Sequence, residues 1–113
     1  MLVVDDEAGI LRFVRTILEL SGYEVFTTTN GEEAVNLARS QPVDVVILDV
    51  LMQPVSGFEV LEKLRSFSQT PVIMFTAQRE ISDMALKVGA NGYLEKPFKP
   101  EQLTQKIREV LNK

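Results

Sequence analysis

Six polar residues of this chain are of types that can do chemistry together. Carboxylates stand in a run of three, Asp5-Asp6-Glu7, and singly at Asp49, while a hydroxyl follows at Thr76 and an ammonium group at Lys96. Carboxylates about 4 Å apart repel by roughly 4 kcal/mol per pair at an effective dielectric near 20, so they must share protons or a cation. Because only oxygen ligands are on offer, the pattern favours a hard cation, and Mg²⁺ suits a small, partly hydrated carboxylate site.

The same set of side chains can handle a phosphoryl group. A carboxylate such as Asp49 can itself be phosphorylated, as a nucleophile. Lys96 can offset the charge of the phosphate oxygens, and the Thr76 hydroxyl can donate a hydrogen bond to one of them. Phosphoryl transfer mainly requires in-line placement and charge neutralisation. We therefore predict a catalytic set of Asp49, Thr76 and Lys96 beside a metal site.

The elements that must position these residues follow from hydrophobic periodicity. Short apolar runs alternate with longer amphipathic stretches, which predicts a parallel sheet covered by helices on both faces, although the strand order does not follow from this pattern alone. Ligands bind at the carboxyl ends of such strands, which is where the polar residues fall. The predicted strands are 2–4, 25–28, 43–48, 71–75 and 92–94, and the predicted helices are 10–18, 32–40, 57–67, 81–88 and 100–111.

Composition limits the classes of function. The 113 residues fit one domain, 1–113, and the net charge of −4 argues against direct nucleic-acid contact by this segment. Without cysteine there is no disulfide framework, and without histidine there is no Ser–His–Asp hydrolase, no His-ligated zinc site and no phosphohistidine on this chain. No apolar run approaches the ~18 residues of a membrane span. We expect a cytoplasmic protein with no membrane partner.

Over nearly its whole length the chain resembles the receiver domains of two-component response regulators. The resemblance implies a flavodoxin-like, doubly wound (βα)5 fold with five parallel strands in the order 2-1-3-4-5, an order that is also a known doubly wound pattern. It is carried by five blocks in order: Leu2-Val3-Val4-Asp5-Asp6-Glu7, Val46-Ile47-Leu48-Asp49, Gly57-Phe58-Glu59, Val72-Ile73-Met74-Phe75-Thr76-Ala77, and Gly89-Ala90 through Tyr93-Leu94-Glu95-Lys96-Pro97-Phe98.

The resemblance also implies the metal site and the acceptor. Asp6, Asp49 and the backbone carbonyl of Leu51 would coordinate Mg²⁺, and Asp5 would act through water. Asp49 would take the phosphoryl group from a sensor histidine kinase, with self-phosphorylation and self-dephosphorylation chemistry but no enzymatic turnover of a separate substrate. Gln53 departs from the family pattern, in which a proline is usual at that place.

Further positions match the part of the family that reads out the phosphoryl group. Lys96 would bridge to the phosphoryl group, and Thr76 and Tyr93 would form a switch pair. The Lys96-Pro97 peptide bond would be cis. The switched output surface would consist of the fourth helix, the fifth strand and the fifth helix, and would contact a second copy of the chain or an effector domain.

Three alternatives compete with this hypothesis. The first is a receiver-like interaction module that is never phosphorylated, but Asp49, its acidic partners and Lys96 are all present. The second is an aspartate-nucleophile phosphatase, which would need a second aspartate where Leu51 stands. The third is a flavodoxin, in which the run Asp5-Asp6-Glu7 would repel the phosphate of the cofactor.

Overall fold

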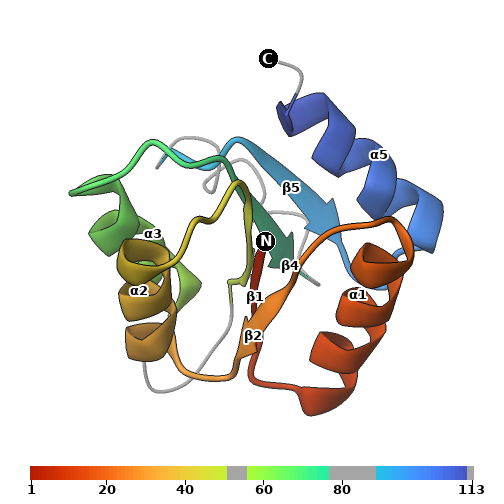
Figure 1. Ribbon diagram of the computed structural model, residues 1–113, viewed down its shortest axis with the longest axis horizontal. Helices are drawn as coiled ribbons and strands as arrows, with labels where there is room; N and C mark the ends of the chain where they lie inside the picture. Colours follow the sequence, from red (N-terminus) through yellow and green to blue (C-terminus); the bar gives the residue numbers. More distant parts are fainter. Residues whose placement is uncertain (51–55, 77–88, 112–113) are drawn as a thin grey trace.

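The computed structural model describes residues 1–50, 56–76 and 89–111, which form a parallel five-stranded sheet with helices on both sides (Figure 1). The strand order is β2-β1-β3-β4-β5, as the resemblance implied. The predicted helix 81–88 lies outside the described residues. The elements are β1 (Leu2–Val4), α1 (Ala8–Leu20), β2 (Phe26–Thr28), α2 (Gly31–Ser40), β3 (Val46–Asp49), α3 (Gly57–Arg65), β4 (Val72–Thr76), β5 (Gly92–Glu95) and α5 (Pro100–Leu111).

The central strands are fully buried, and their register brings their carboxyl ends to one edge. Val4 of β1 pairs with Leu48 of β3, and Asp49 pairs with Phe75 of β4. The third strand was predicted over 43–48, but it begins at Val46 and includes Asp49. The apolar run is longer than the stretch that finds partners, because its neighbours β1 and β4 begin only at Leu2 and Val72.

Local signals set the ends of the helices. Asn30 caps α2 by accepting hydrogen bonds from the amides of Glu32 and Glu33 at 2.8 and 3.1 Å. The helix therefore begins at Gly31, one residue earlier than predicted. At the end of α1, Gly22 has a φ of 90°, a conformation that glycine adopts without strain.

The sheet separates two hydrophobic cores (Figure 1). One core lies between the sheet and helices α2 and α3, and it includes Ala34, Val60 and Leu64 together with Leu48 and Met74 of the strands. The other core lies on the opposite face, beneath α1 and α5, where Val14, Leu18, Leu103 and Ile107 pack against strand residues that include Phe75. Alternate strand residues thus serve opposite faces, as the pleat requires. None of the helices in the described part of the chain is long and apolar enough to cross a membrane.

A guanidinium group holds the end of the sheet remote from the polar residues. Arg65, the last residue of α3, donates hydrogen bonds to the carbonyl oxygens of Gly89, Ser68 and Thr70 and to the side-chain oxygen of Asn91. The same oxygen of Asn91 accepts a hydrogen bond from the first amide of β4 at 2.9 Å. One arginine therefore ties the exit of α3 to the entries of β4 and β5.

Candidate functional site: an acidic cluster at the carboxyl edge of the sheet

Three carboxylates come together where β1 and β3 end. One oxygen from each of Asp5, Asp6 and Asp49 lies within 4.8 Å of the others. Asp5 and Asp49 are buried, whereas Asp6 is exposed to solvent. The structure thus brings together the acids predicted from the sequence, while Leu51 lies outside the described residues.

Backbone hydrogen bonds orient the most deeply buried of these acids. The amide of Asp5 donates to the carbonyl oxygen of Thr28 at 3.2 Å, which continues the ladder between β1 and β2 by one residue. Its Oδ1 accepts a hydrogen bond from the amide of Glu7 at 2.9 Å. This local turn fixes the carboxylate and starts the connection into α1. The side chain is therefore held in place before any ligand arrives.

Lys96 joins two of the carboxylates directly. Its Nζ donates to Asp5 Oδ2 at 2.8 Å and lies 3.5 Å from Asp49 Oδ1. Burial by itself would lower the pKa of the Lys96 ammonium group, but the hydrogen bond to Asp5 and the negative charges nearby, foremost Asp49, outweigh it, so the pKa is raised. The lysine is a fixed positive charge between two buried negative ones.

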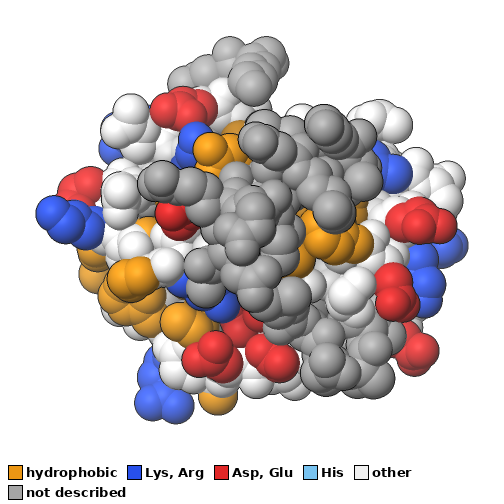
Figure 2. Space-filling model, turned by 180° about the vertical axis from the view of Figure 1, so that it is seen from behind, with side chains coloured by type: hydrophobic (Ala, Val, Ile, Leu, Met, Phe, Trp, Pro, Cys, Tyr) orange, Lys and Arg blue, Asp and Glu red, His pale blue; other side chains and the backbone are white. Residues whose placement is uncertain are grey.

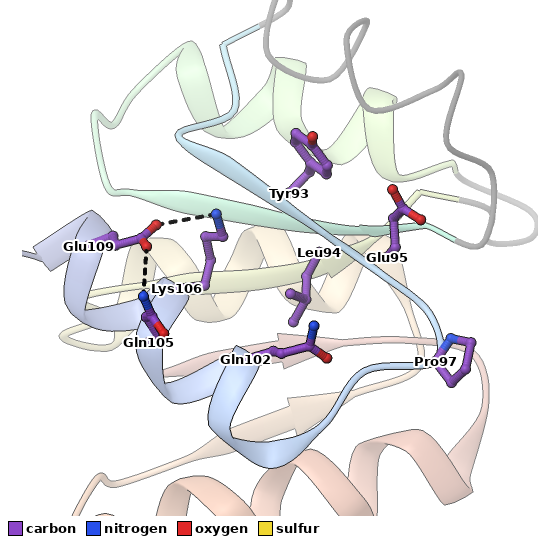
Figure 3. A pocket seen from close by; sticks show the side chains of 8 residues that line it. All are labelled: Tyr93, Leu94, Glu95, Pro97, Gln102, Gln105, Lys106 and Glu109. Carbon is purple, nitrogen blue, oxygen red and sulfur yellow. Dashed lines mark hydrogen bonds and ion pairs between the residues drawn. The ribbon is translucent and has the colours of Figure 1, made fainter.

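Thr76 and Tyr93 lie on the same face of the sheet. Thr76, the buried last residue of β4, pairs with Glu95, and Tyr93 pairs with Met74, two residues earlier on β4. Because side chains two residues apart share a face, Tyr93 and Thr76 belong to one side of neighbouring strands. Tyr93 is half-buried and leaves β5 on the side opposite to Leu94 (Figure 3). The Lys96-Pro97 peptide bond is cis, as predicted.

The backbone beside Asp49 leaves no room for a side chain at Gly57, the first residue of α3. The amide of Gly57 donates to the carbonyl oxygen of Val50 at 2.9 Å, and a Cβ at this position would overlap the carbonyl oxygen of Asp49. The sequence analysis used Gly57 as the start of a predicted helix and as part of a family block, but it gave no role to the missing side chain. Glycine is more usual just after the end of a helix than at its start. Its presence at the start of a predicted helix is therefore the sequence signal that could have revealed this close contact.

The donor set fits a hard divalent cation. Two buried carboxylates and one exposed carboxylate offer only oxygen ligands, and together they carry more negative charge than the single lysine offsets. Asp5, Asp6 and Asp49 are the described residues that would hold such an ion.

The order of the strands and the acids at their carboxyl edge define a flavodoxin-like domain of the kind that handles phosphoryl groups. Residues 1–108 match the family model described as the response regulator receiver domain. The chain belongs to the response regulator receiver family of two-component signalling. The flavodoxin-like fold and the assignment to receiver domains that the sequence predicted are thus confirmed.

Individual relatives agree with the family. The chain is 45% identical over 115 residues to the "Probable transcriptional regulator ycf27" of Porphyra purpurea and 37% identical over 116 residues to the alkaline phosphatase synthesis transcriptional regulatory protein PhoP of Bacillus subtilis. These matches take in all of the chain but 47% and 48% of the relatives, so the chain spans about half their length.

Solved structures give the same result for the fold. The chemotaxis response regulator CheY4 of Vibrio cholerae has a TM-score of 0.91 and 40% identity, with 97% of this chain and 96% of that one covered. The receiver domain of NtrX from Brucella abortus has a TM-score of 0.92 and 29% identity, with 98% and 97% covered.

Proposed function

We propose that Asp49 of this receiver domain accepts a phosphoryl group from the phosphohistidine of a sensor histidine kinase. The observation that carries the proposal is the position of Lys96, whose ammonium group lies between Asp5 and Asp49. An oxygen of Asp49 attacks the phosphorus, a P–O bond forms, and the P–N bond to the donor histidine breaks. The ammonium group of Lys96 then moves from the Asp49 carboxylate to the oxygens of the phosphoryl group on Asp49.

The other site residues prepare this reaction. Asp5 stays fixed by the Glu7 amide and keeps Lys96 charged and in reach of Asp49. Thr76, at the end of the neighbouring strand, supplies a hydroxyl for a phosphoryl oxygen. A Mg²⁺ ion held by Asp5, Asp6 and Asp49 would neutralise charge on the transferring group. The Leu51 carbonyl remains a predicted further ligand.

An apolar hollow next to the acids is where we propose that the kinase helix carrying the phosphohistidine docks. The hollow is about 490 Å³ and is lined by Glu7, Ile10, Phe13, Lys96, Pro97 and Phe98. Phe13 is 43% exposed, and its ring lies 6.0 Å from that of Phe98. Hydrophobic side chains gather on the side of the molecule where α1 lies in Figure 2, at the lower left. Exposed apolar area that shares Lys96 with the acid cluster suits a donor that must place its phosphoryl group over Asp49.

The read-out follows from the shared face of Thr76 and Tyr93. When Thr76 turns its hydroxyl to the phosphoryl group, it vacates space on the face that Tyr93 also occupies. A hydrogen bond to a charged group contributes ~1.5–3 kcal/mol, which is the usual size of allosteric coupling. We propose that β5 and α5 form part of the surface that responds. The predicted fourth helix of this surface lies outside the described residues.

In the whole protein we propose that this surface controls a transcriptional effector domain, because the similar ycf27 and PhoP proteins are named transcriptional regulators and are about twice as long. The coding sequence of the complete protein tests this proposal.

A second copy of the domain is the other partner that the responding surface would accept. Sedimentation of the protein with and without beryllofluoride, which mimics the phosphoryl group, would detect such a dimer.

Asp49→Ala is expected to abolish phosphorylation. Incubation with acetyl phosphate and Mg²⁺ should add one phosphoryl group to the intact mass of the wild-type protein and none to that of the variant. Asp44→Ala is the matched control, because Asp44 is an exposed acid just before the opposite end of the same strand. An adduct that persists in Asp49→Ala would place the acceptor elsewhere, and a wild-type protein that takes up no phosphoryl group from acetyl phosphate or kinase would favour the unphosphorylated interaction module.

Asp6→Asn is expected to weaken Mg²⁺ binding by at least about tenfold, because a charged oxygen ligand becomes a neutral one. Isothermal calorimetry of the two proteins measures the affinity, with Asp44→Asn as the control for the loss of one negative charge. Equal affinities for wild type and Asp6→Asn would show that Asp6 is not a ligand.

A further inference from the structure

A shallow hollow of about 460 Å³ lies between β5 and α5, away from the acidic cluster. Figure 3 shows the side chains that line it, with Tyr93 on β5 and with Lys106 and Glu109 on α5. The site chemistry uses none of the α5 side chains. Two of them nevertheless hold a defined arrangement next to the tyrosine of the proposed switch.

The ammonium group of Lys106 lies between an aromatic ring and a carboxylate. Its Nζ is 6.0 Å from the centroid of the Tyr93 ring and 3.2 Å from Glu109 Oε2. The other oxygen of Glu109 accepts a hydrogen bond from Gln105 at 3.5 Å. Dashed lines in Figure 3 mark both contacts to Glu109. The carboxylate is thus held from two sides, and it holds the lysine in turn.

The methylene stem of Lys106 packs closely against Gly92 of β5. A Cβ at Gly92 would lie 3.2 Å from Cδ of Lys106, so the methylene stem of the lysine rests on this buried position of β5. The Lys106 side chain is only 29% exposed as a result. A lysine held at both its stem and its head is confined, unlike an ordinary surface lysine.

We propose that Lys106, held by Glu109 and seated on Gly92, is a positioning residue that retains Tyr93 in the half-exposed place it has before phosphorylation. A cation near the face of a tyrosine attracts the ring, and movement of Tyr93 toward Thr76 breaks this contact. The inference rests on the proposed switch and adds a restraint on it. Such a contact at a partly exposed site corresponds to roughly a two- to fivefold bias in population.

Fluorine NMR of the protein labelled with 3-fluorotyrosine tests the proposal. The chain has two tyrosines, so Tyr23, on the α1 face, provides a reference signal within each sample. In Lys106→Met, which keeps the apolar stem and removes the charge, the Tyr93 signal of the unliganded protein should move toward its beryllofluoride-saturated position. The midpoint for beryllofluoride in the presence of Mg²⁺ should fall about two- to fivefold.

Two further variants separate the restraint from simple packing. Lys106→Arg keeps a cation near the ring and should behave as the wild type, while Glu109→Gln should shift the Tyr93 signal in the same direction as Lys106→Met. Thermal unfolding of each variant confirms that it is folded. A Lys106→Met protein with wild-type Tyr93 signal and midpoint, or a Lys106→Arg protein that behaves as Lys106→Met, would overturn the restraint.

The same spectra keep the two proposals apart. If beryllofluoride moves Tyr93 in the wild type but Lys106→Met changes nothing, the switch stands and the restraint is wrong. If beryllofluoride binds but the Tyr93 signal of the wild type does not respond, the switch itself is wrong, and the restraint falls with it.

Discussion

Lys96 is the residue whose position says most about the unphosphorylated state. It neutralises part of the charge that Asp5 and Asp49 bring into the protein interior, and its Nζ lies within hydrogen-bonding distance of Asp5. The family resemblance implied that Lys96 contacts the phosphoryl group. The structure adds that, without a phosphoryl group, Lys96 pairs with Asp5 and Asp49. Hydrophobic pattern alone cannot reveal this pairing, because it depends on the side-chain path of a residue beyond the end of β5.

Lys96→Met is expected to destabilise the Mg²⁺-free protein. Two buried carboxylates lose their positive partner, which costs about 2–4 kcal/mol of unfolding free energy, or a fall in Tm of roughly 8–15 °C for a domain of this size. Mg²⁺ should raise the Tm of the variant more than that of the wild type, because the ion then takes over the neutralisation. Differential scanning calorimetry with and without Mg²⁺ measures both effects.

The control for Lys96→Met is Lys99→Met, since Lys99 is an exposed lysine three residues further along the chain. Equal Mg²⁺-dependent gains in Tm for Lys96→Met and wild type would contradict the view that lysine and metal balance the same carboxylates.

At the scale of elements, the sequence predicted five strands of a parallel sheet, because each strand is a short apolar run next to turn residues. It missed where some of them begin, since Val43 and Val45 are apolar like the strand that follows, and only pairing with β1 and β4 decides which residues join the sheet. It also missed the close approach of α3 to β3. That contact depends on a backbone distance at Gly57, which no periodicity encodes.

Gly57→Ala is expected to lower the unfolding free energy by about 1–3 kcal/mol, because the new methyl group overlaps the Asp49 carbonyl and forces α3 away from β3. Gly9→Ala is the matched control: a Cβ at Gly9, in the first turn of α1, meets nothing within 4 Å, so this change should add roughly 0.5–1 kcal/mol. Urea denaturation measures the unfolding free energy of both variants, which should fall for Gly57→Ala and rise for Gly9→Ala.

The Gly57→Ala protein should also take up a phosphoryl group from acetyl phosphate more slowly, because the displaced backbone carries Asp49, the proposed acceptor. If Gly57→Ala were as stable as Gly9→Ala, the proposed contact between α3 and β3 would be wrong.

At the scale of the whole molecule, β5 and the loop that follows it contribute a residue to each of three places: the surroundings of the acid cluster, the apolar hollow and the hollow beside Tyr93. Lys96 belongs to the first, Lys96 and Phe98 to the second, and Tyr93 to the third. In the proposed function, the domain takes its phosphoryl group at the acid cluster and reports it at the surface formed by β5 and α5. The family resemblance implied the acid cluster and the responding surface, but it predicted neither hollow, because each depends on how side chains from distant elements pack.

Phe13→Ser is expected to slow phosphorylation by a histidine kinase about tenfold or more while leaving the rate with acetyl phosphate unchanged. The reason is that an exposed aromatic anchor contributes to docking of a protein donor and not to the chemistry at Asp49. Transfer rates from a phosphorylated kinase and from acetyl phosphate give the comparison. The matched change is Phe67→Ser, because Phe67 is an exposed phenylalanine that follows α3. A kinase rate unaffected by Phe13→Ser would move the docking surface away from α1.

The division of the interior by the sheet has a consequence for how such proteins diverge. The core beneath α1 and α5 shares no side chain with the core beneath α2 and α3 among the described residues. Substitutions in separate, non-contacting groups of residues add independently. After a gene duplication, one copy can therefore accumulate compensating changes beneath α1, the helix that carries the docking surface proposed above, without disturbing the opposite layer. With the proposed docking surface, the residues that keep related signalling pathways separate in one cell would all lie on a single face of the domain.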